Sequence, residues 1–395
     1  MTFPERFSDL PEYAFPRLRA LLDGHAPGGP VVSMSIGEPK HAFPEWVPQI
    51  IAENASEFGK YPPNEGSPEL LNAIAGWISR RYGVDLALDQ QVMALNGTRE
   101  GLFNACLALC PEKTAAGQRP AILIPNPFYQ VYAVAALAVG AEPVYLPALA
   151  ETGFLPDFAS LDPALLDRTE IAYICTPSNP QGAVASRDYL AQLFALAERH
   201  DFKVFADECY SELYAGNTAP VGALQVAKDM GISPERVLLF NSLSKRSSLA
   251  GLRSGFVAGG PDCIARIKQL RTYAGAPLPL PLQRVAQQVW GDEAHVAHNR
   301  ALYQDKYQLA DEIFAGVPGF QPVRAGFFLW LPVEDAEAAT LKIWRETGVR
   351  VLPGPYLGRE VDGRNPGDGY IRAALVAPRD ELAGGLKALR ACIYG

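Results

Sequence analysis

Cysteine and histidine are too sparse and too scattered in this sequence to build a disulfide framework or a zinc site. The chain has six cysteines and five histidines, with no CxxC pair and no cluster of histidines. Both kinds of site need ligands at characteristic close spacings. We therefore expect no metal ion and a reducing compartment. The six cysteines are Cys106, Cys110, Cys175, Cys209, Cys263 and Cys392.

An excess of positive charge and a long apolar run are also missing. The chain has 35 Lys and Arg against 43 Asp and Glu, a net charge of -8, and the two signs are interspersed. It therefore lacks the basic stripe with which proteins bind nucleic acid. Met1–Leu10 contains no apolar signal-peptide region, and the small-apolar stretch Ala133–Ala141 is about half as long as a membrane span. We expect a cytoplasmic protein with no nucleic-acid or membrane partner.

Short apolar runs alternate with helix-like segments through the middle of the chain. In Ser186–His200, for example, apolar residues recur on one helical face. Such alternation predicts an α/β fold with a mainly parallel sheet covered by helices, in which ligands bind at the carboxyl ends of the strands. The seven candidate strands are Val92–Leu95, Ala121–Pro125, Glu142–Leu146, Ile171–Cys175, Lys203–Ala206, Val237–Phe240 and Gly255–Ala258.

The two ends of the chain have a different pattern. With 395 residues the chain is too long for one ordinary core. We predict a large domain at 45–290 and a smaller α+β domain formed by 1–44 and 291–395. The C-terminal part of the small domain should contain a charged helix, two short strands and a Gly/Pro-rich loop, at Asp292–Phe314, Phe327–Leu331, Tyr370–Ala374 and Pro353–Gly369.

A lysine follows the candidate strand Val237–Phe240. Lys245 is flanked by serines, and Arg253 lies in the same segment. A lysine whose charge is suppressed can form a covalent imine, and serines with an arginine supply the donors that a phosphate needs. A solvated loop fits this segment alone equally well. Ser242-x-x-Lys245 also matches a serine-acylase signature, but the Ser-Asp-Asn and Lys-Thr-Gly partners are missing, so we attribute that match to chance.

Two other strand ends carry polar side chains. Lys203–Ala206 is followed by Asp207 and then by Tyr210. A carboxylate there can hold a pyridine nitrogen protonated, although capping the next turn is its more common role. Asn179 follows the strand that ends at Cys175, in a segment whose Pro and Gly also suit a plain turn.

Two earlier junctions complete the series. Leu95 is followed by Asn-Gly-Thr-Arg-Glu-Gly101. A glycine at a helix start exposes N–H groups that bind phosphate, whereas an ordinary N-cap by Asn96 or Thr98 is the simpler explanation. Pro125–Tyr132 places aromatic rings at a strand end, where they stack on a flat heterocycle or join the core.

Taken together, five of the seven strand-to-loop junctions carry, in chain order, a phosphate cradle, a stacking ring, an amide, a carboxylate and a lysine. An aromatic aldehyde phosphate would use all five groups. The combination predicts an enzyme that binds pyridoxal phosphate through Lys245.

On these residues the sequence resembles the class I/II (fold-type I) pyridoxal-phosphate aminotransferases over almost its whole length. Within the family it is most similar to the succinyldiaminopimelate aminotransferases of lysine biosynthesis. The resemblance implies a homodimer with shared active sites whose partners are small-molecule substrates, namely amino acids and keto acids. The segments that carry it are Ser35–His41, Pro125–Tyr132, Glu208–Glu212 and Ser242–Ser247.

The resemblance also implies a set of cofactor contacts. Lys245 holds pyridoxal phosphate as a Schiff base, and Asp207 pairs with the ring nitrogen. Tyr129 stacks on the ring, while Tyr210 and Asn179 contact its oxygen. The residues implied around the phosphate are Gly97, Thr98, Arg99, Ser242, Ser244 and Arg253, together with Tyr61 of the other subunit.

For the substrate, the resemblance implies that Arg372 clamps the α-carboxylate, with Gly37 and Asn179 beside it. Lys245, Asp207 and Tyr210 are the implied catalytic residues. The implied reaction transfers an amino group from L-glutamate to N-succinyl-2-amino-6-oxoheptanedioate. Candidates for the distal end of that substrate are Lys40, Arg246 and Tyr273.

Two departures from the family pattern bear on this assignment. Gln181 stands where Asn-Pro-Thr-Gly usually has threonine, and Ser247–Gly251 differs from the subfamily's Ser-Asn-x-Pro-Gly at Ser248 and Ala250. The alternatives are an aminotransferase of other specificity and a C–S β-lyase on the same cofactor. A non-enzymatic metabolite sensor would need a DNA-binding module, which neither 1–44 nor the acidic charge provides.

Overall fold

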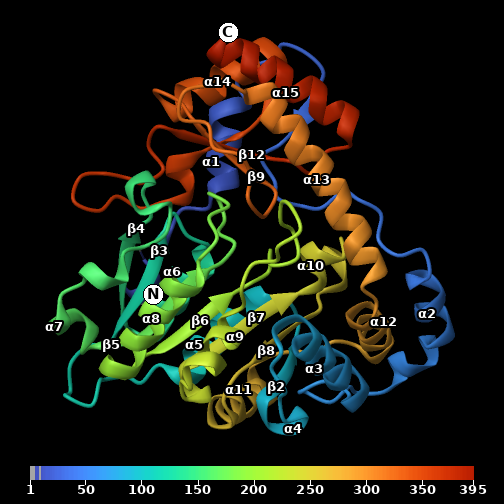
Figure 1. Ribbon diagram of the computed structural model, residues 1–395, viewed down its shortest axis with the longest axis vertical. Helices are drawn as coiled ribbons and strands as arrows, with labels where there is room; N and C mark the ends of the chain where they lie inside the picture. The colour runs from blue at the N-terminus through green and yellow to red at the C-terminus, as the bar shows by residue number, and fades with distance from the viewer. Residues whose placement is uncertain (1–4, 9) are drawn as a thin grey trace.

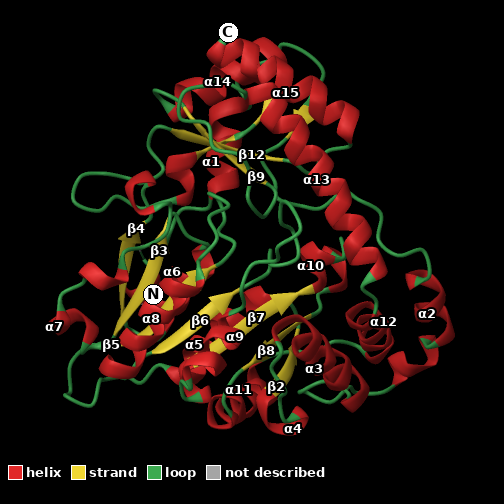
Figure 2. Ribbon diagram, viewed as in Figure 1, coloured by secondary structure: helices red, strands yellow, loops and turns green. Residues whose placement is uncertain are grey.

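A seven-stranded sheet forms the centre of the molecule in the computed structural model, which describes residues 5–8 and 10–395 (Figures 1 and 2). Residues 1–4 and Asp9, which belong to the predicted small domain, lie outside this description. The order is β2-β8-β7-β6-β5-β3-β4. The strands are β2 (Val92–Leu95), β3 (Ala121–Asn126), β4 (Glu142–Pro147), β5 (Thr169–Cys175), β6 (Lys203–Asp207), β7 (Val237–Ser242) and β8 (Gly255–Ala258).

The sheet confirms the predicted fold class. β4, β3, β5, β6 and β7 pair in parallel, and β8 runs antiparallel to both of its neighbours, β2 and β7. All seven predicted strands are present, with shifts of up to two residues at their ends. One shift affects the site, because β7 continues through Ser242 and fixes that residue on the sheet instead of in a loop.

Alternating side chains on each strand build two separate cores, because successive residues of a strand point to opposite faces. In β6, Val204 and Ala206 join the core on one face, while Phe205 joins the core on the other. One face is covered by α3 (Pro68–Tyr82), α8 (Arg187–His200), α9 (Ala223–Met230) and α12 (Leu280–Gly291). The other is covered by α5 (Thr98–Leu109), α6 (Gln130–Ala138) and α11 (Pro261–Ala274).

Local sequence signals start several of these helices. Ser186 caps α8 by accepting a hydrogen bond from the Tyr189 backbone N–H at 3.1 Å. Ser67 caps α3 in the same way through Leu70, and Pro68 occupies the first helical position, where its missing N–H costs nothing. The remaining large-sheet helices are α2 (Val47–Glu53), α4 (Leu88–Gln91), α7 (Pro163–Leu166) and α10 (Leu243–Arg246).

Helix α1 (Ala14–Leu22) and strand β1 (Val32–Ser33) lie together with the C-terminal segment above the large sheet (Figure 1). A three-stranded antiparallel sheet has the order β11-β12-β9, and β1 pairs in parallel with β10. These strands are β1 (Val32–Ser33), β9 (Phe328–Pro332), β10 (Val349–Arg350), β11 (Leu352–Pro353) and β12 (Tyr370–Ala374). The helices are α1 (Ala14–Leu22), α13 (Ala294–Phe314), α14 (Ala336–Thr347) and α15 (Arg379–Tyr394).

The predicted strands of this part appear as β9 and β12, but three two-residue strands were not predicted, because two residues leave no periodicity. The predicted loop Pro353–Gly369 is not wholly irregular, since Gly354–Leu357 forms a 3-10 helix. The domain boundaries at residues 44 and 290 stay a prediction. No helix in the described part of the chain has both the length and the apolar character of a membrane span.

Candidate active site

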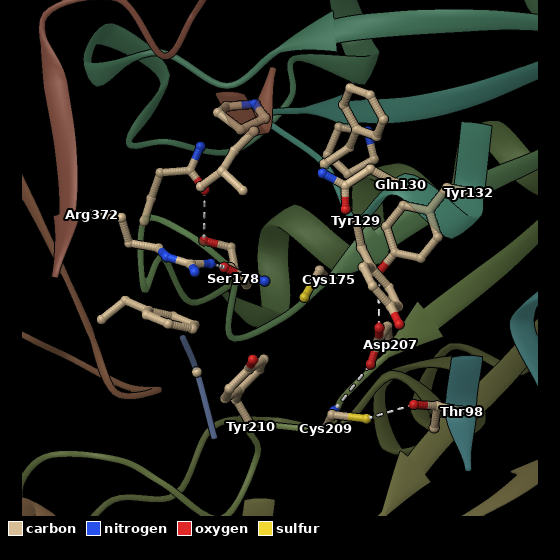
Figure 3. Close-up of a pocket in the computed structure, with 18 of the residues that line it drawn as sticks. Thr98, Tyr129, Gln130, Tyr132, Cys175, Ser178, Asp207, Cys209, Tyr210 and Arg372 are labelled. Carbon is tan, nitrogen blue, oxygen red and sulfur yellow. Dashed lines mark hydrogen bonds between the residues drawn. The ribbon is translucent and has the colours of Figure 1, made fainter. Parts of the chain in front are cut away.

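A cavity of about 320 Å³ lies at the carboxyl ends of the parallel strands, below the small sheet. This is where ligands bind in open α/β sheets. The ends of β6 and β7 and the segments that follow β3 and β5 deliver polar side chains to it, and β12 contributes Arg372 (Figure 3). The predicted residues that line it are Gly37, Thr98, Arg99, Tyr129, Asn179, Asp207, Tyr210, Ser242, Ser244, Lys245, Arg253 and Arg372.

Two predicted residues lie outside this lining. Gly97 sits behind it as the N-cap of α5 with φ +84, and a Cβ at this position would collide with the Arg253 guanidinium. The positive φ therefore favours glycine here, and a side chain at this position would displace the Arg253 guanidinium from beside α5. Tyr61 has a relative exposure of 102% and reaches no part of the cavity in its own chain.

The carboxylate at the end of β6 is buried and held from two sides. Asp207 accepts a hydrogen bond from the Tyr132 hydroxyl at 2.8 Å and from the Cys209 backbone N–H at 3.3 Å (Figure 3). Burial raises the pKa of Asp207, and these two hydrogen bonds oppose the rise. Asp207 thus caps the following turn and also faces the cavity, so the two roles considered from the sequence coexist.

Lys245, in the short helix α10, points into the cavity, where its Nζ donates to the Gly37 carbonyl at 2.6 Å. Burial lowers the pKa of Lys245 to about 8, and the positive charges of Arg372 and Arg253 act in the same direction. A lysine with a pKa near neutrality exists partly as the free amine, which is the nucleophilic and proton-accepting form.

Hydrogen-bond donors gather at the sheet end of the cavity. The Thr98 hydroxyl lies 3.3 Å from the Cys209 thiol, and the Ser242 hydroxyl lies 3.5 Å from the same sulfur. A thiol is a weak hydrogen-bonding partner, so both hydroxyls keep donor capacity for an anion. The N-terminus of the twelve-residue helix α5 and the guanidinium of Arg253 lie beside them. This arrangement suits a phosphate.

A buried arginine faces this donor group from the small sheet. Arg372 donates from Nη1 to the Asn179 side-chain oxygen at 2.8 Å and from Nη2 to the Ser35 carbonyl at 2.7 Å. Its Nε is buried and has no partner in the described part of the chain. Burial lowers its pKa to about 10. Gly37 lies close by, and a Cβ there would collide with the Phe328 ring.

Two tyrosines complete the walls of the cavity. Tyr210 packs edge-on against Phe327 and Phe328. The Tyr129 hydroxyl accepts a hydrogen bond from Arg99 Nε at 2.6 Å. Burial raises the pKa of both tyrosines, so their hydroxyls stay protonated at neutral pH.

Three weaker predictions do not fit this cavity. Arg246 is buried elsewhere, where it donates to Glu293 and to the Val289 carbonyl between two tryptophans. Lys40 and Tyr273 do not line the cavity either. Cys209 was not predicted from the sequence, and Tyr132 was expected only as a ring for stacking or the core. The sequence contained a signal for Tyr132 as a site residue, because it follows Tyr129 by about one helical turn. It contained no such signal for Cys209.

The described residues contain no cluster of three or more His, Cys, Asp or Glu side chains that could hold a metal ion. All six cysteines are free thiols.

The family of class I and II aminotransferases matches residues 29–381. The chain belongs to this family. Its members use pyridoxal phosphate, so the predicted cofactor and the predicted family are confirmed.

This aminotransferase is similar along its whole length to several known proteins. It is 31% identical to an LL-diaminopimelate aminotransferase of Dehalococcoides mccartyi, with 98% of each chain covered. Among solved structures, an aminotransferase of Neisseria meningitidis is 36% identical with a TM-score of 0.93, covering 98% of this chain and 99% of that one. Aminotransferase AspB of Helicobacter pylori is 32% identical with a TM-score of 0.89 and 99% coverage of both chains. These comparisons do not extend to the predicted succinylated substrate.

The cavity fits pyridoxal phosphate on three observations. Among the described residues, the hydroxyls of Thr98 and Ser242 have a thiol as their one hydrogen-bond partner, Lys245 has a lowered pKa, and Arg372 has an unpaired buried donor. The residues that would hold the phosphate are therefore those at the N-terminus of α5 together with Ser244 and Arg253, and the Asp207 carboxylate would be available to the ring nitrogen.

The lowered pKa of Lys245 predicts how cofactor uptake depends on pH. The neutral amine is needed for covalent attachment, and its pKa is about 8. The rate at which cofactor-free protein takes up pyridoxal phosphate should therefore rise about tenfold per pH unit below that pKa and level off above it. Stopped-flow absorbance of the bound cofactor measures this rate. A rate that falls with rising pH would contradict the assignment of Lys245.

Proposed function

We propose that this aminotransferase transfers an amino group from L-glutamate to a keto acid with the diaminopimelate skeleton, N-succinyl-2-amino-6-oxoheptanedioate. The observation that carries the proposal is the convergence of Lys245, Asp207 and Arg372 on one cavity. The full-length similarity to LL-diaminopimelate aminotransferases supports the seven-carbon skeleton.

Lys245 is the proposed covalent anchor and proton carrier. Pyridoxal phosphate, when bound, supplies a ring that withdraws electrons from the substrate's α-carbon. The Lys245 amine takes the α-proton as a base and delivers it as an acid. Positioned proton transfer of this kind contributes about 10²–10⁴-fold to the rate.

Arg372 is the proposed clamp for the α-carboxylate. Its Nε is unpaired among the described residues, and Nη2, on the same edge of the guanidinium, carries a second N–H besides the one donated to the Ser35 carbonyl, so this edge can present two parallel donors. Such a fork matches the two oxygens of a carboxylate. Asn179, which bonds Arg372, and Tyr210 also line the cavity and are proposed to contact the ring oxygen.

The charge of the cavity supports a substrate with further anionic groups. Arg99, Lys245, Arg253 and Arg372 line it, whereas Asp207 is the one carboxylate among the described lining residues. Diaminopimelate carries a distal ammonium, which would find no carboxylate here besides the one assigned to the cofactor. N-succinylation replaces that ammonium by an amide and a carboxylate. The lining therefore favours the succinylated form.

The test compares amino donors in the reverse direction. N-succinyl-LL-2,6-diaminopimelate, LL-2,6-diaminopimelate, L-glutamate and L-norvaline are each mixed with the cofactor-loaded protein, and the absorbance change of the cofactor gives kcat/KM. We expect the succinylated donor and glutamate to react fastest. Faster reaction of LL-diaminopimelate would reject the succinylated substrate and keep the transaminase. Release of pyruvate from cystathionine without a keto acid would instead identify a β-lyase.

Arg99 is the proposed partner of the distal carboxylate, because its guanidinium lies at the cavity wall beside Tyr129, while its backbone N–H serves the phosphate end. We expect Arg99→Gln to lower kcat/KM for glutamate by about 10–100-fold. L-Norvaline, which lacks the distal carboxylate, is the matched control and should react as with the unmodified protein. An equal loss with both donors would show that Arg99 serves the cofactor instead.

The second proposed partner is another copy of the chain. Phe58, Tyr61 and Tyr273 expose 56%, 102% and 87% of their surface. The loop that carries Tyr61 is tied to α11, which carries Tyr273, because Arg271 donates to the Asn64 carbonyl at 3.2 Å. Exposed apolar side chains grouped in this way mark a protein interface. We propose a homodimer in which Tyr61 reaches the phosphate site of the partner subunit.

Mixing two inactive variants tests this arrangement. In a dimer of one Tyr61→Ala subunit and one Lys245→Ala subunit, one site receives an intact Lys245 from the first chain and an intact Tyr61 from the second. Mixed dimers, prepared by refolding the two chains together, should therefore recover activity that neither variant has alone. A mixture that stays at the summed activity of the separate variants would reject the shared site.

A further inference from the structure

Tyr132 lies directly behind the carboxylate that faces the cavity. Its side chain is 1% exposed, and its hydroxyl donates to Asp207 Oδ2 at 2.8 Å (Figure 3). The other oxygen of Asp207 accepts the Cys209 backbone N–H at 3.3 Å. Each carboxylate oxygen can accept a second hydrogen bond, so capacity remains on the side that lines the cavity.

The position of the Tyr132 hydroxyl is fixed by its ring. The ring stacks on Tyr173 with centroids 4.4 Å apart and an interplanar angle of 16°, and it meets Tyr129 edge-on at 5.8 Å. Tyr173 is itself buried, and its hydroxyl donates to the Leu102 carbonyl at 3.1 Å. Tyr132 therefore has little freedom to turn away from Asp207.

We propose that Tyr132 is a positioning residue that holds Asp207 ionised and aimed at the cavity, so that the ring nitrogen of pyridoxal phosphate keeps its proton. This inference rests on the proposed role of Asp207. One proton is shared between the carboxylate and the nitrogen, and whichever base is weaker loses it. The Tyr132 hydroxyl stabilises the carboxylate anion and therefore leaves the proton on the nitrogen.

The structure provides a matched pair of variants. Tyr132→Phe removes the hydroxyl and keeps the ring that stacks on Tyr173. Tyr173→Phe removes an equally buried hydroxyl from the same stack but leaves Asp207 untouched, because that hydroxyl bonds the Leu102 carbonyl. A general loss of packing or stability affects both variants, whereas a change at Asp207 affects Tyr132→Phe alone.

The readout is the ¹⁵N chemical shift of cofactor labelled at the ring nitrogen and bound to each variant, because this shift separates the protonated from the neutral ring. We expect Tyr132→Phe to move the ¹⁵N chemical shift toward the value of the neutral ring. Tyr173→Phe should give the same shift as the unmodified protein. The glutamate half-reaction should slow by about tenfold or more in Tyr132→Phe, the size expected for one hydrogen bond to a charged group. The loss should appear in kcat and not in KM.

Asp207→Asn separates the two ways in which the inference can fail. If Asp207→Asn shifts the signal but Tyr132→Phe matches Tyr173→Phe, the role of Tyr132 is wrong and that of Asp207 stands. If Asp207→Asn leaves the signal unchanged, the proposed role of Asp207 is wrong and the inference falls with it. A shifted signal and a slowed half-reaction in Tyr132→Phe alone would establish it.

Discussion

Lys245→Ala is expected to abolish amino transfer from glutamate, with a loss of at least about 10²–10⁴-fold, because no other group in the described cavity can carry the α-proton in its place. The pKa of Lys245 is about 8, which lets the amine accept and return a proton near neutral pH. Tyr210 and Tyr129 have raised pKa values and stay protonated, and the Asp207 carboxylate is held by the Tyr132 hydroxyl and the Cys209 backbone N–H. Single-turnover absorbance with glutamate measures the loss.

Lys306 offers a matched control for this variant. It is also buried, at 2% exposure, and burial lowers its pKa to about 8 as well. It does not line the cavity, and its Nζ contacts the Val376 carbonyl at 3.4 Å. Lys306→Met should keep the half-reaction. Borohydride reduction of the loaded protein followed by peptide mapping should find the cofactor on Lys245. Cofactor attached to Lys306 would contradict the assignment of Lys245 as the covalent anchor.

Arg372→Ala is expected to lower kcat/KM for glutamate by about 10²–10³-fold, the usual effect of removing one partner of a buried charge pair. Arg372→Lys should recover little, because an ammonium cannot reproduce the two parallel donors of the guanidinium. The measurement is the glutamate half-reaction at several concentrations. Arg350→Lys is the control, since Arg350 also lies over an aromatic ring, that of Trp344, but outside the cavity.

A change in the substrate isolates the contact that Arg372 makes. Glutamate α-amide lacks the α-carboxylate, so the unmodified protein should use it about as poorly as Arg372→Ala uses glutamate. Arg372→Ala should then show no further loss with the amide, because the interaction has already been removed. If the two losses multiplied, Arg372 would be acting through some group other than the α-carboxylate.

The strands and the residues that follow them were predictable from the sequence alone. Apolar runs bounded by turn residues marked β2 to β8 to within two residues. The polar residues after these runs reach one cavity because parallel strands end at the same edge of a sheet. The short strands β1, β10 and β11 escaped prediction because they owe their existence to pairing with distant segments.

The contacts around the site were less predictable. The hydrogen bond between Tyr132 and Asp207 joins residues 75 positions apart, and that between Arg372 and Asn179 joins residues 193 apart. Local sequence patterns predict neither hydrogen bond, since each depends on how helices and sheets pack against one another. For the same reason, the sequence suggested Arg246, next to Lys245, as a contact for the distal end of the substrate. In the structure its side chain packs between two tryptophans and donates to α12 instead.

The sequence by itself determined the sheet, the cofactor-binding chemistry and the family, because strand periodicity and the residue types at strand ends are local properties. The tertiary structure alone decided which charges share the cavity and which groups tune them. It placed Lys245 and Arg372 in a buried site that lowers both pKa values, and it left a single carboxylate among the described lining residues. Burial and electrostatic coupling depend on distances between segments remote in the chain, and only folding sets those distances.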